Sequence, residues 1–199
     1  MNEKIENSTI NSALFTDFYE LTMAQGYWKN DMNQDVVFDM FFRRQPFNGG
    51  FSIFAGLDTL LDAITDFTFS PSDIEFLRQQ KIFEPGFLEY LKTFRFRGDV
   101  YAFREGSVIF PQEPIVRIHA KLIEAQIVEA LVLNHINFQS LIATKTARIW
   151  LASKKGSIME FGLRRAQGPD GGMSATRASF IGGAAGTSNT LAGKLYDIP

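Results

Sequence analysis

The last third of the chain alternates a strand-like run with glycine-rich loops and helix-compatible segments, and this order restricts the fold more than any other feature. Residues 156–161 have the character of a short buried strand. Glycine-rich loops follow at 168–172 (GPDGG) and 182–186 (GGAAG), with helix-compatible residues between and after them. Such β-loop-α alternation is typical of the opening units of a parallel α/β domain.

The portion before residue 122 mixes helices and strands and predicts an α+β module. Thr16 can cap the first helix, and Ser70 followed by Pro71 is a strong helix start. Short β-branched and aromatic runs between glycine and proline breaks favour strands. We expect helices at residues 16–30, 57–64, 71–80 and 84–94, and strands at 36–44, 51–54, 100–104, 107–110 and 115–119.

The pattern changes at Leu122, where apolar residues line one face of a long helix. A second helix is expected over residues 141–153. We therefore predict an N-terminal α+β domain with its connecting helix at residues 1–140, and a second α/β domain that begins at 141 and continues to 199.

Composition excludes several classes of function. The 20 basic and 22 acidic residues give a net charge of -2, which argues against nucleic acid as a partner. The chain has no cysteine, so disulfides, thiolate catalysis and cysteine-bound zinc are excluded. Its two histidines, His119 and His135, are expected to be structural, and no metal site is predicted. No apolar run approaches the roughly 20 residues of a membrane span, which favours a soluble cytoplasmic protein.

Two arginines, Arg164 and Arg165, follow the predicted strand end, where α/β enzymes place ligand-binding groups. The planar guanidinium offers two parallel donors that suit a phosphate. A surface salt-bridge pair is the alternative, but two arginines between glycines favour ligand binding.

The run at 182–189 (GGAAGTSN) offers exposed amides and the side chains of Thr187, Ser188 and Asn189 ahead of a helix-like segment, as an anion cradle does. It has neither the lysine of a Walker loop nor the dinucleotide fingerprint, and on glycine spacing alone a structural turn is the better interpretation. The loop at 168–172 is interpreted as mobile, and Ser174, Thr176 and Arg177 as a solvated helix face.

Several motifs, which follow one another in the same order as in a known family, add to the prediction of an α/β enzyme that binds phosphate. They are TDFYELTMAQG (16–26), FFRRQPFNGGFSIFAGL (41–57), EGSVIFPQEP (105–114), ATKTAR (143–148), EFGLRRAQG (160–168) and GGAAGTSN (182–189). Together they resemble nicotinate phosphoribosyltransferase through nearly the whole chain.

The resemblance implies an enzyme that joins nicotinate to phosphoribosyl pyrophosphate with ATP hydrolysis, forming nicotinate mononucleotide for NAD biosynthesis. It implies magnesium bound with the substrate phosphates, a homodimer, and an irregular (β/α) barrel of the type II phosphoribosyltransferase kind, of which residues 141–199 are the start. Phe161 would stack on the pyridine, and Tyr19 of the neighbouring subunit would cover its other face. Arg164 would hold phosphate with help from Arg165.

Thr187, Ser188 and Asn189 would line the nicotinate end, where a hydroxyl or amide tolerates a carboxylate better than an aspartate would. The family's phosphorylated catalytic histidine belongs to a segment beyond Pro199, so we expect no catalytic residue in this chain, an incomplete barrel and an inactive fragment. The alternatives are a non-catalytic dimerisation or binding module and a nicotinamide-selective relative.

Overall fold

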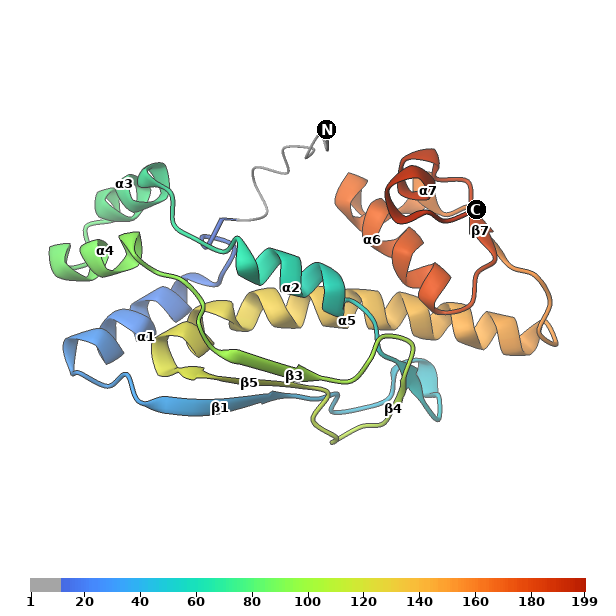
Figure 1. Ribbon diagram of the computed structural model, residues 1–199, viewed down its shortest axis with the longest axis horizontal. Coiled ribbons are helices and arrows are strands. Elements are labelled where there is room, and N and C mark those ends of the chain that lie inside the picture. The colour runs from blue at the N-terminus through green and yellow to red at the C-terminus, as the bar shows by residue number, and fades with distance from the viewer. Residues whose placement is uncertain (1–11) are drawn as a thin grey trace. The chain divides into compact units, whose positions relative to one another are not determined.

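The computed structural model describes residues 12–199 and mixes helices with short sheets, which confirms the α/β class (Figure 1). The chain forms two compact units that are interleaved along the sequence. The first contains the described residues up to Asp39 together with 58–101 and 117–133. The second contains residues 40–57, 102–116 and 134–199.

Helices make up most of the first unit. All of α2 except its first residue, Leu57, belongs to this unit. The four are α1 (Phe18–Lys29), α2 (Leu57–Thr65), α3 (Pro71–Gln79) and α4 (Pro85–Lys92). Ser70 begins α3 as predicted, because its hydroxyl accepts from the Asp73 N–H and the Asp73 carboxylate accepts from the Ser70 N–H. The predicted cap at Thr16 is wrong. The N-cap of α1 is Asp17, so Thr16 lies one residue outside the capping position.

Three strands form the larger sheet in the order β1-β5-β3 (Figure 1). Their bounds are β1 (Asp35–Met40), β3 (Asp99–Ala102) and β5 (Val116–Lys121). Buried and exposed residues alternate along β5, with Val116 and Ile118 buried and Arg117 and His119 exposed. This period of two is that of a sheet with one face on the core.

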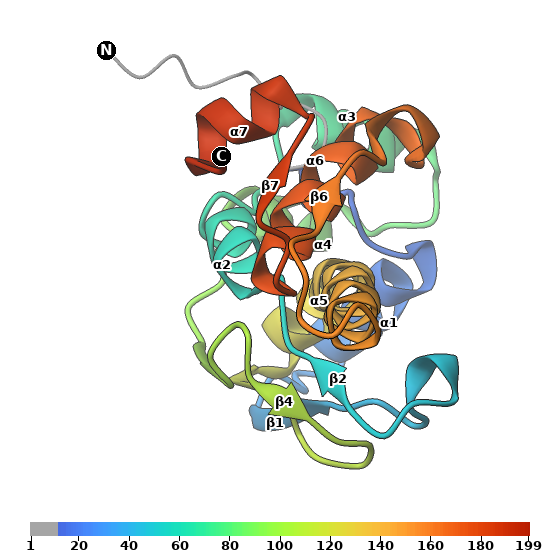
Figure 2. The ribbon, with the colours of Figure 1, turned by 90° about the vertical axis from the view of Figure 1, so that its right-hand side faces the viewer.

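One helix of 31 residues, α5 (Leu122–Ala152), replaces the two helices that the sequence predicted. It runs without a break in Figure 1 and is seen along its axis in Figure 2. The expected break before Leu141 is wrong because residues 133–140 contain neither glycine nor proline. Buried positions continue through that stretch at Ile136, Gln139 and Ser140. Both units therefore draw core residues from α5.

In the second unit, β2 (Ser52–Ile53) pairs antiparallel with β4 (Val108–Ile109), and a short 3-10 helix η1 (Pro46–Asn48) precedes them. Hydroxyl groups of α5 bind the backbone next to β2. Thr144 Oγ1 accepts from the Ile53 N–H at 2.8 Å, and Ser140 Oγ accepts from the Ala55 N–H at 3.1 Å. The core at this point contains four alanines, which let the backbones approach closely, together with one larger residue: Ala55, Ala143, Ala147, Ala178 and Ile53.

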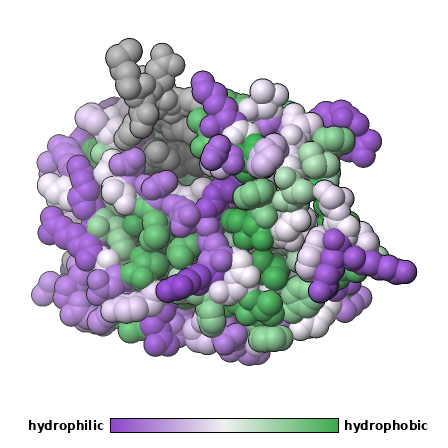
Figure 3. Space-filling model, turned by 45° about the vertical axis from the view of Figure 1, so that its right-hand side comes forward, coloured by the Kyte–Doolittle hydropathy of each residue, from purple (hydrophilic) through white to green (hydrophobic). Residues whose placement is uncertain are grey.

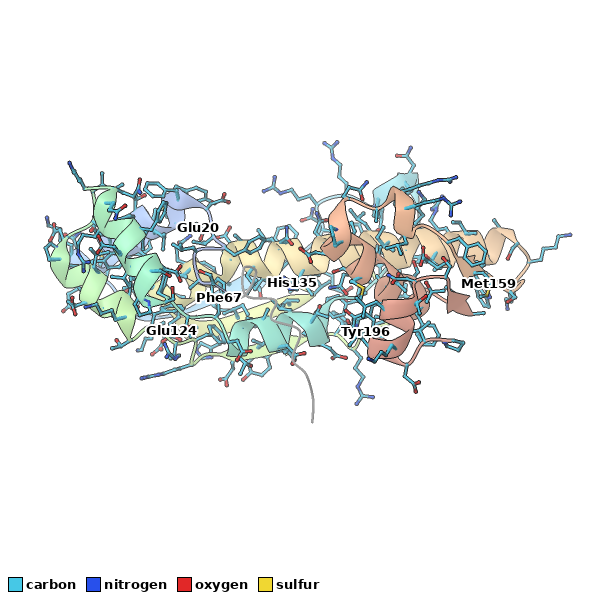
Figure 4. The ribbon with its side chains drawn as sticks, turned by 90° about the horizontal axis from the view of Figure 1, so that it is seen from above. Glu20, Phe67, Glu124, His135, Met159 and Tyr196 are labelled. Carbon is cyan, nitrogen blue, oxygen red and sulfur yellow. The ribbon has the colours of Figure 1, made fainter. Side chains whose placement is uncertain are left out.

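The chain continues through a β-α-β arrangement, as the alternation predicted. Its elements are β6 (Met159–Glu160), η2 (Leu163–Arg165), α6 (Gly168–Ile181), β7 (Gly186–Thr187) and α7 (Thr190–Tyr196). β6 and β7 pair in parallel with α6 between them in sequence. Met159 at the start of β6 and Tyr196 at the end of α7 are labelled in Figure 4.

Two expectations in this region are wrong. The strand is not buried, because Met159 is 49% exposed and β6 belongs to a sheet of two strands only. The loop expected at 168–172 is the first turn of α6, where Pro169 suits a helix because its missing N–H would have no partner there. Within residues 12–199 no helix has both the length and the apolar character needed to cross a bilayer.

Candidate substrate-binding site

The carboxyl ends of β6 and β7 bring together two segments that are far apart in the sequence. Glu160 is the register partner of Thr187 in this parallel pair. The two chains therefore leave the sheet at the same edge, with Phe161 following one strand and Ser188 the other. The Ser188 N–H donates to the Glu160 carbonyl at 3.0 Å, which fixes this alignment. The predicted anion cradle and the predicted arginine loop therefore meet.

Phe161 exposes 57% of its surface at this edge. A large apolar ring left this open to water can stack against a flat ligand. Exposed apolar side chains also occur elsewhere on the surface, where they give the green areas of Figure 3. Phe41 and Phe110 also follow strands directly, so what distinguishes Phe161 is that the β7 loop with Ser188 leaves its sheet at the same edge.

Arg164 and Arg165 lie on η2, three and four residues after Phe161, and both are exposed. Neither guanidinium makes a hydrogen bond or ion pair with the residues that the structure describes. Arg165 lines a cavity of about 410 Å³ that Glu160, Gly162 and Leu163 also line. Two uncompensated positive charges beside an open aromatic ring can bind a planar anion and a phosphate.

The side chain of Glu160 holds this edge together. Its Oε2 accepts from Thr187 Oγ1 at 2.7 Å and from Thr176 Oγ1 on α6 at 3.0 Å. Its Oε1 accepts from the Gly162 N–H. One carboxylate therefore links β6, β7, α6 and the start of the arginine loop. The sequence reasoning did not single out this residue.

Thr187, Ser188 and Asn189 have different surroundings. The Thr187 hydroxyl donates to Glu160 and accepts from the Asn189 N–H at 2.9 Å. Asn189 is 3% exposed, and its Oδ1 accepts from the Ala192 N–H at 3.3 Å as the N-cap of α7. Ser188 is exposed. Of the three side chains, Ser188 is the one most open to a ligand in solution.

A second polar cluster, formed by Glu105 and Arg177, corrects the prediction of a solvated helix face. Arg177 makes two parallel bonds to Glu105, Nη1 to Oε1 at 2.8 Å and Nη2 to Oε2 at 2.6 Å. Glu105 Oε1 also accepts from the N–H groups of Gly56 at 2.5 Å and Leu57 at 2.9 Å, at the start of α2. Burial opposes ionisation, but Arg177 and these amides hold the pKa of Glu105 below its usual value.

The burial of this helix face had a signal in the sequence. Gly172, Thr176 and Ser179 follow the i, i+4, i+7 spacing of one helix face, and all three are buried. Their small size is typical of a helix face that approaches another backbone closely. The polarity of Thr176 and Arg177 favoured a solvated face, whereas the spacing of the three small residues indicates the buried face that the structure has.

Tyr19 lies in the first turn of α1, in the first unit, and is 53% exposed. The charge of the neighbouring Glu20 raises the pKa of its phenol. Glu20, which is labelled in Figure 4, is 1% exposed. Its Oε2 accepts from Gln126 Nε2 at 3.0 Å. Burial raises the pKa of the Glu20 carboxyl.

The two histidines belong to different units, His119 to the first and His135 to the second. His119 is exposed on β5 and His135 is half-buried on α5. Across residues 12–199, no three histidine, cysteine, aspartate or glutamate side chains gather closely enough to hold a metal ion. These residues therefore do not fit a protein-held magnesium site.

Residues 14–137 match the family model of the nicotinate phosphoribosyltransferase N-terminal domain. The chain belongs to the nicotinate phosphoribosyltransferase family. It is 46% identical over 187 residues to nicotinate phosphoribosyltransferase pncB2 of Mycobacterium tuberculosis and 47% identical over 191 residues to nicotinate phosphoribosyltransferase of Caenorhabditis elegans. These matches cover 94% of this chain, but 40% and 34% of the two relatives. The resemblance seen in the motifs is thereby confirmed.

Two solved structures support the fold. Human nicotinic acid phosphoribosyltransferase is 38% identical with a TM-score of 0.86, over 92% of this chain and 38% of that one. Nicotinate-nucleotide pyrophosphorylase of Pyrococcus furiosus is 22% identical with a TM-score of 0.77, over 98% of this chain and 43% of that one. The second likeness supports the fold alone. The chain thus spans well under half the length of the relatives it matches.

Proposed function

We propose that this chain forms the pyridine- and phosphate-binding corner of a nicotinate phosphoribosyltransferase. The enzyme would join the ring nitrogen of nicotinate to the anomeric carbon of phosphoribosyl pyrophosphate and release pyrophosphate, with ATP hydrolysed, for NAD biosynthesis. One observation carries the proposal besides family membership. The parallel pairing of β6 and β7 sets the open ring of Phe161 and two unpaired arginines beside the β7 edge.

In this proposal Phe161 stacks on the pyridine ring. Stacking holds a flat heterocycle by its face and leaves the ring nitrogen free, so that the nitrogen can attack the ribose carbon. The nucleophile must reach a centre that develops positive charge as pyrophosphate leaves. A platform that fixes the ring plane therefore contributes through orientation.

Arg164 then binds phosphate oxygens, with Arg165 as its helper. Charge-assisted hydrogen bonds from a guanidinium are about twice as strong as neutral ones, and they gain strength as charge builds up on the leaving group. That both side chains are exposed and unpaired among the described residues supports this role.

The nicotinate end would be lined by Thr187, Ser188 and Asn189. Their hydrogen bonds suggest that the three residues have different roles. Thr187 and Asn189 shape the loop through their bonds to Glu160 and to α7, and the exposed Ser188 hydroxyl faces the ligand carboxylate. A hydroxyl can donate to a carboxylate, whereas an aspartate would repel it.

The remaining parts of the proposal depend on segments or copies outside this structure. Tyr19 would cover the pyridine from the neighbouring subunit of a homodimer, and its half-exposed ring supports such a contact. Residues 141–199 would begin the barrel domain. Magnesium and ATP would meet the enzyme through substrate phosphates, because residues 12–199 supply no carboxylate cluster for a metal. We place the enzyme in the cytoplasm.

The experiment measures nicotinate mononucleotide formation by a chimera that joins this chain to the part of the M. tuberculosis relative that it does not cover. Product from nicotinate, phosphoribosyl pyrophosphate and ATP supports the proposal. Product from nicotinamide in its place would point to a nicotinamide-selective enzyme. No product, with no heat when nicotinate is titrated into the 199-residue chain, would favour a non-catalytic module.

Phe161→Ala in the chimera tests the platform. Loss of the stacked ring should raise the KM for nicotinate about tenfold. Phe110→Ala is the matched control, because Phe110 is 52% exposed in the same unit but lies outside the β6–β7 edge. Unchanged nicotinate kinetics in Phe161→Ala would contradict the stacking role.

A further inference from the structure

Phe161 lies between Glu160 and Gly162 in the chain, and hydrogen bonds of Glu160 hold both of these neighbours in place. The Glu160 carbonyl accepts from the Ser188 N–H at 3.0 Å, which joins the chain before Phe161 to the β7 loop. The Glu160 carboxylate accepts from the Gly162 N–H, which holds the chain after Phe161. The backbone on each side of the Phe161 ring is thus held by a hydrogen bond that Glu160 accepts.

The same carboxylate fixes this short loop to the rest of the unit. Thr187 Oγ1 donates to Glu160 Oε2 at 2.7 Å from β7, and Thr176 Oγ1 lies 3.0 Å from the same oxygen on α6. Gly162 fits closely against it, since a Cβ there would lie 2.8 Å from Glu160 Oε1. The absence of a side chain at Gly162 therefore lets its N–H approach the Glu160 carboxylate.

An ionised carboxylate suits this set of partners because the Gly162 N–H can only donate and both threonine hydroxyls can donate. Two carboxylate oxygens can accept the three bonds together. A glutamine of the same size offers one oxygen and one NH₂. If the NH₂ faces Gly162, that N–H loses its acceptor; if it faces the threonines, both hydroxyls must donate elsewhere, Thr176 to the Gly172 carbonyl and Thr187 to the carbonyl of residue 160. A glutamine therefore loses the Gly162 bond or changes the bonds of both threonines, whereas the carboxylate accepts from all three groups at once.

We propose that Glu160 is a positioning residue that sets the plane of the Phe161 ring and the approach of Arg164 relative to the β7 loop. This inference rests on the proposed function, because the ring and the arginine act on the substrates of that reaction. Glu160 acts through Phe161 and η2, since its own oxygens are occupied by Gly162, Thr176 and Thr187.

The test is a double-mutant cycle in the chimera. Glu160→Gln should raise the KM for nicotinate about tenfold, by loss of a charge-assisted bond, whereas a fall in folded protein would lower the apparent kcat alone. Combined with Phe161→Ala, the same change should cost much less, because there is no ring left to position. Glu105→Gln is the matched control: it removes another engaged carboxylate of this unit and should lower Tm without changing the nicotinate KM.

An unchanged KM in Glu160→Gln, or an effect that is undiminished beside Phe161→Ala, would overturn the positioning role. Amide hydrogen exchange on the 199-residue chain separates this result from failure of the proposed function. Faster exchange at Gly162 and Ser188 in Glu160→Gln, with α1 unchanged, supports the role of Glu160 even if the parent chimera makes no product. Unchanged exchange at both amides would overturn it.

Discussion

Glu20 in the first unit and Glu105 in the second are both shielded from water, but their partners differ in charge. Glu20 accepts from the neutral amide of Gln126, and the charge of Glu129 adds to the penalty of burial. Glu105 faces the guanidinium of Arg177 and two backbone N–H groups. Burial penalises the ionised form of both, yet the pKa of Glu20 is raised and that of Glu105 is lowered.

The comparison shows that burial alone does not determine the state of a carboxylate. A full positive charge in bidentate contact outweighs the loss of water, and a neutral amide does not. Glu105 therefore holds a negative charge between the Leu57 N–H, at the first residue of α2, and Arg177 of α6. Glu20 binds a proton more readily than a glutamate in water does.

The largest expected effect follows from removing the positive charge. Arg177→Met leaves Glu105, whose side chain is only 14% exposed, without its counter-ion and should lower the free energy of unfolding by about 3 kcal/mol. Chemical denaturation measures this change. Arg117→Met is the control, because the Arg117–Asp39 pair is exposed and should contribute little. Equal losses in both variants would contradict the distinction between buried and exposed pairs.

Acid should weaken the second unit through Glu105. Since its pKa in the folded protein lies below the ordinary 4.5, the stability it contributes is present above that pH and is lost as the pH falls through the folded value. Glu105→Gln should lower Tm near neutral pH, and the difference from wild type should shrink in acid. A difference that stays constant with pH would show that the ionised state of Glu105 contributes nothing.

For Glu20, the stability contribution should change with pH in the opposite direction to that of Glu105, and the effect should be the smallest of the three. Its raised pKa means that its contribution is present below the ordinary 4.5 and is lost as the pH rises through the folded value. Glu20→Gln keeps an oxygen for the Gln126 amide and should therefore raise Tm slightly at pH 7, but less at pH 4. Glu89→Gln, on the exposed face of α4, should change neither. A lower Tm at pH 7 for Glu20→Gln would contradict a net penalty for its charge.

Local patterns in the sequence predicted much of the fold. The capped start of α3 and the β-α-β order of the last third follow from short-range spacing, and both are present. The same order explains why Phe161 and Ser188 meet at one strand edge. Patterns of this kind depend on residues within a few positions of each other, so one sequence is enough to read them.

The polar contacts that shape the site are long-range, and for that reason the sequence did not predict them. Arg177 and Glu105 lie 72 residues apart, and Glu160 and Thr187 lie 27 apart. Nothing in local spacing pairs a particular glutamate with a particular arginine. The roles of Tyr19, Phe161 and Arg164 come from the family resemblance and stay predictions.

The continuous α5 has a consequence for how the protein unfolds. Its residues up to Leu133 belong to one unit and those from Asn134 to the other, with no break in the hydrogen-bonded backbone between them. Helix formation is cooperative along a segment, so loss of packing at one end of α5 removes support from the other. We therefore expect heating to melt both units in a single transition, and proteolytic cutting within α5 to release neither unit in folded form.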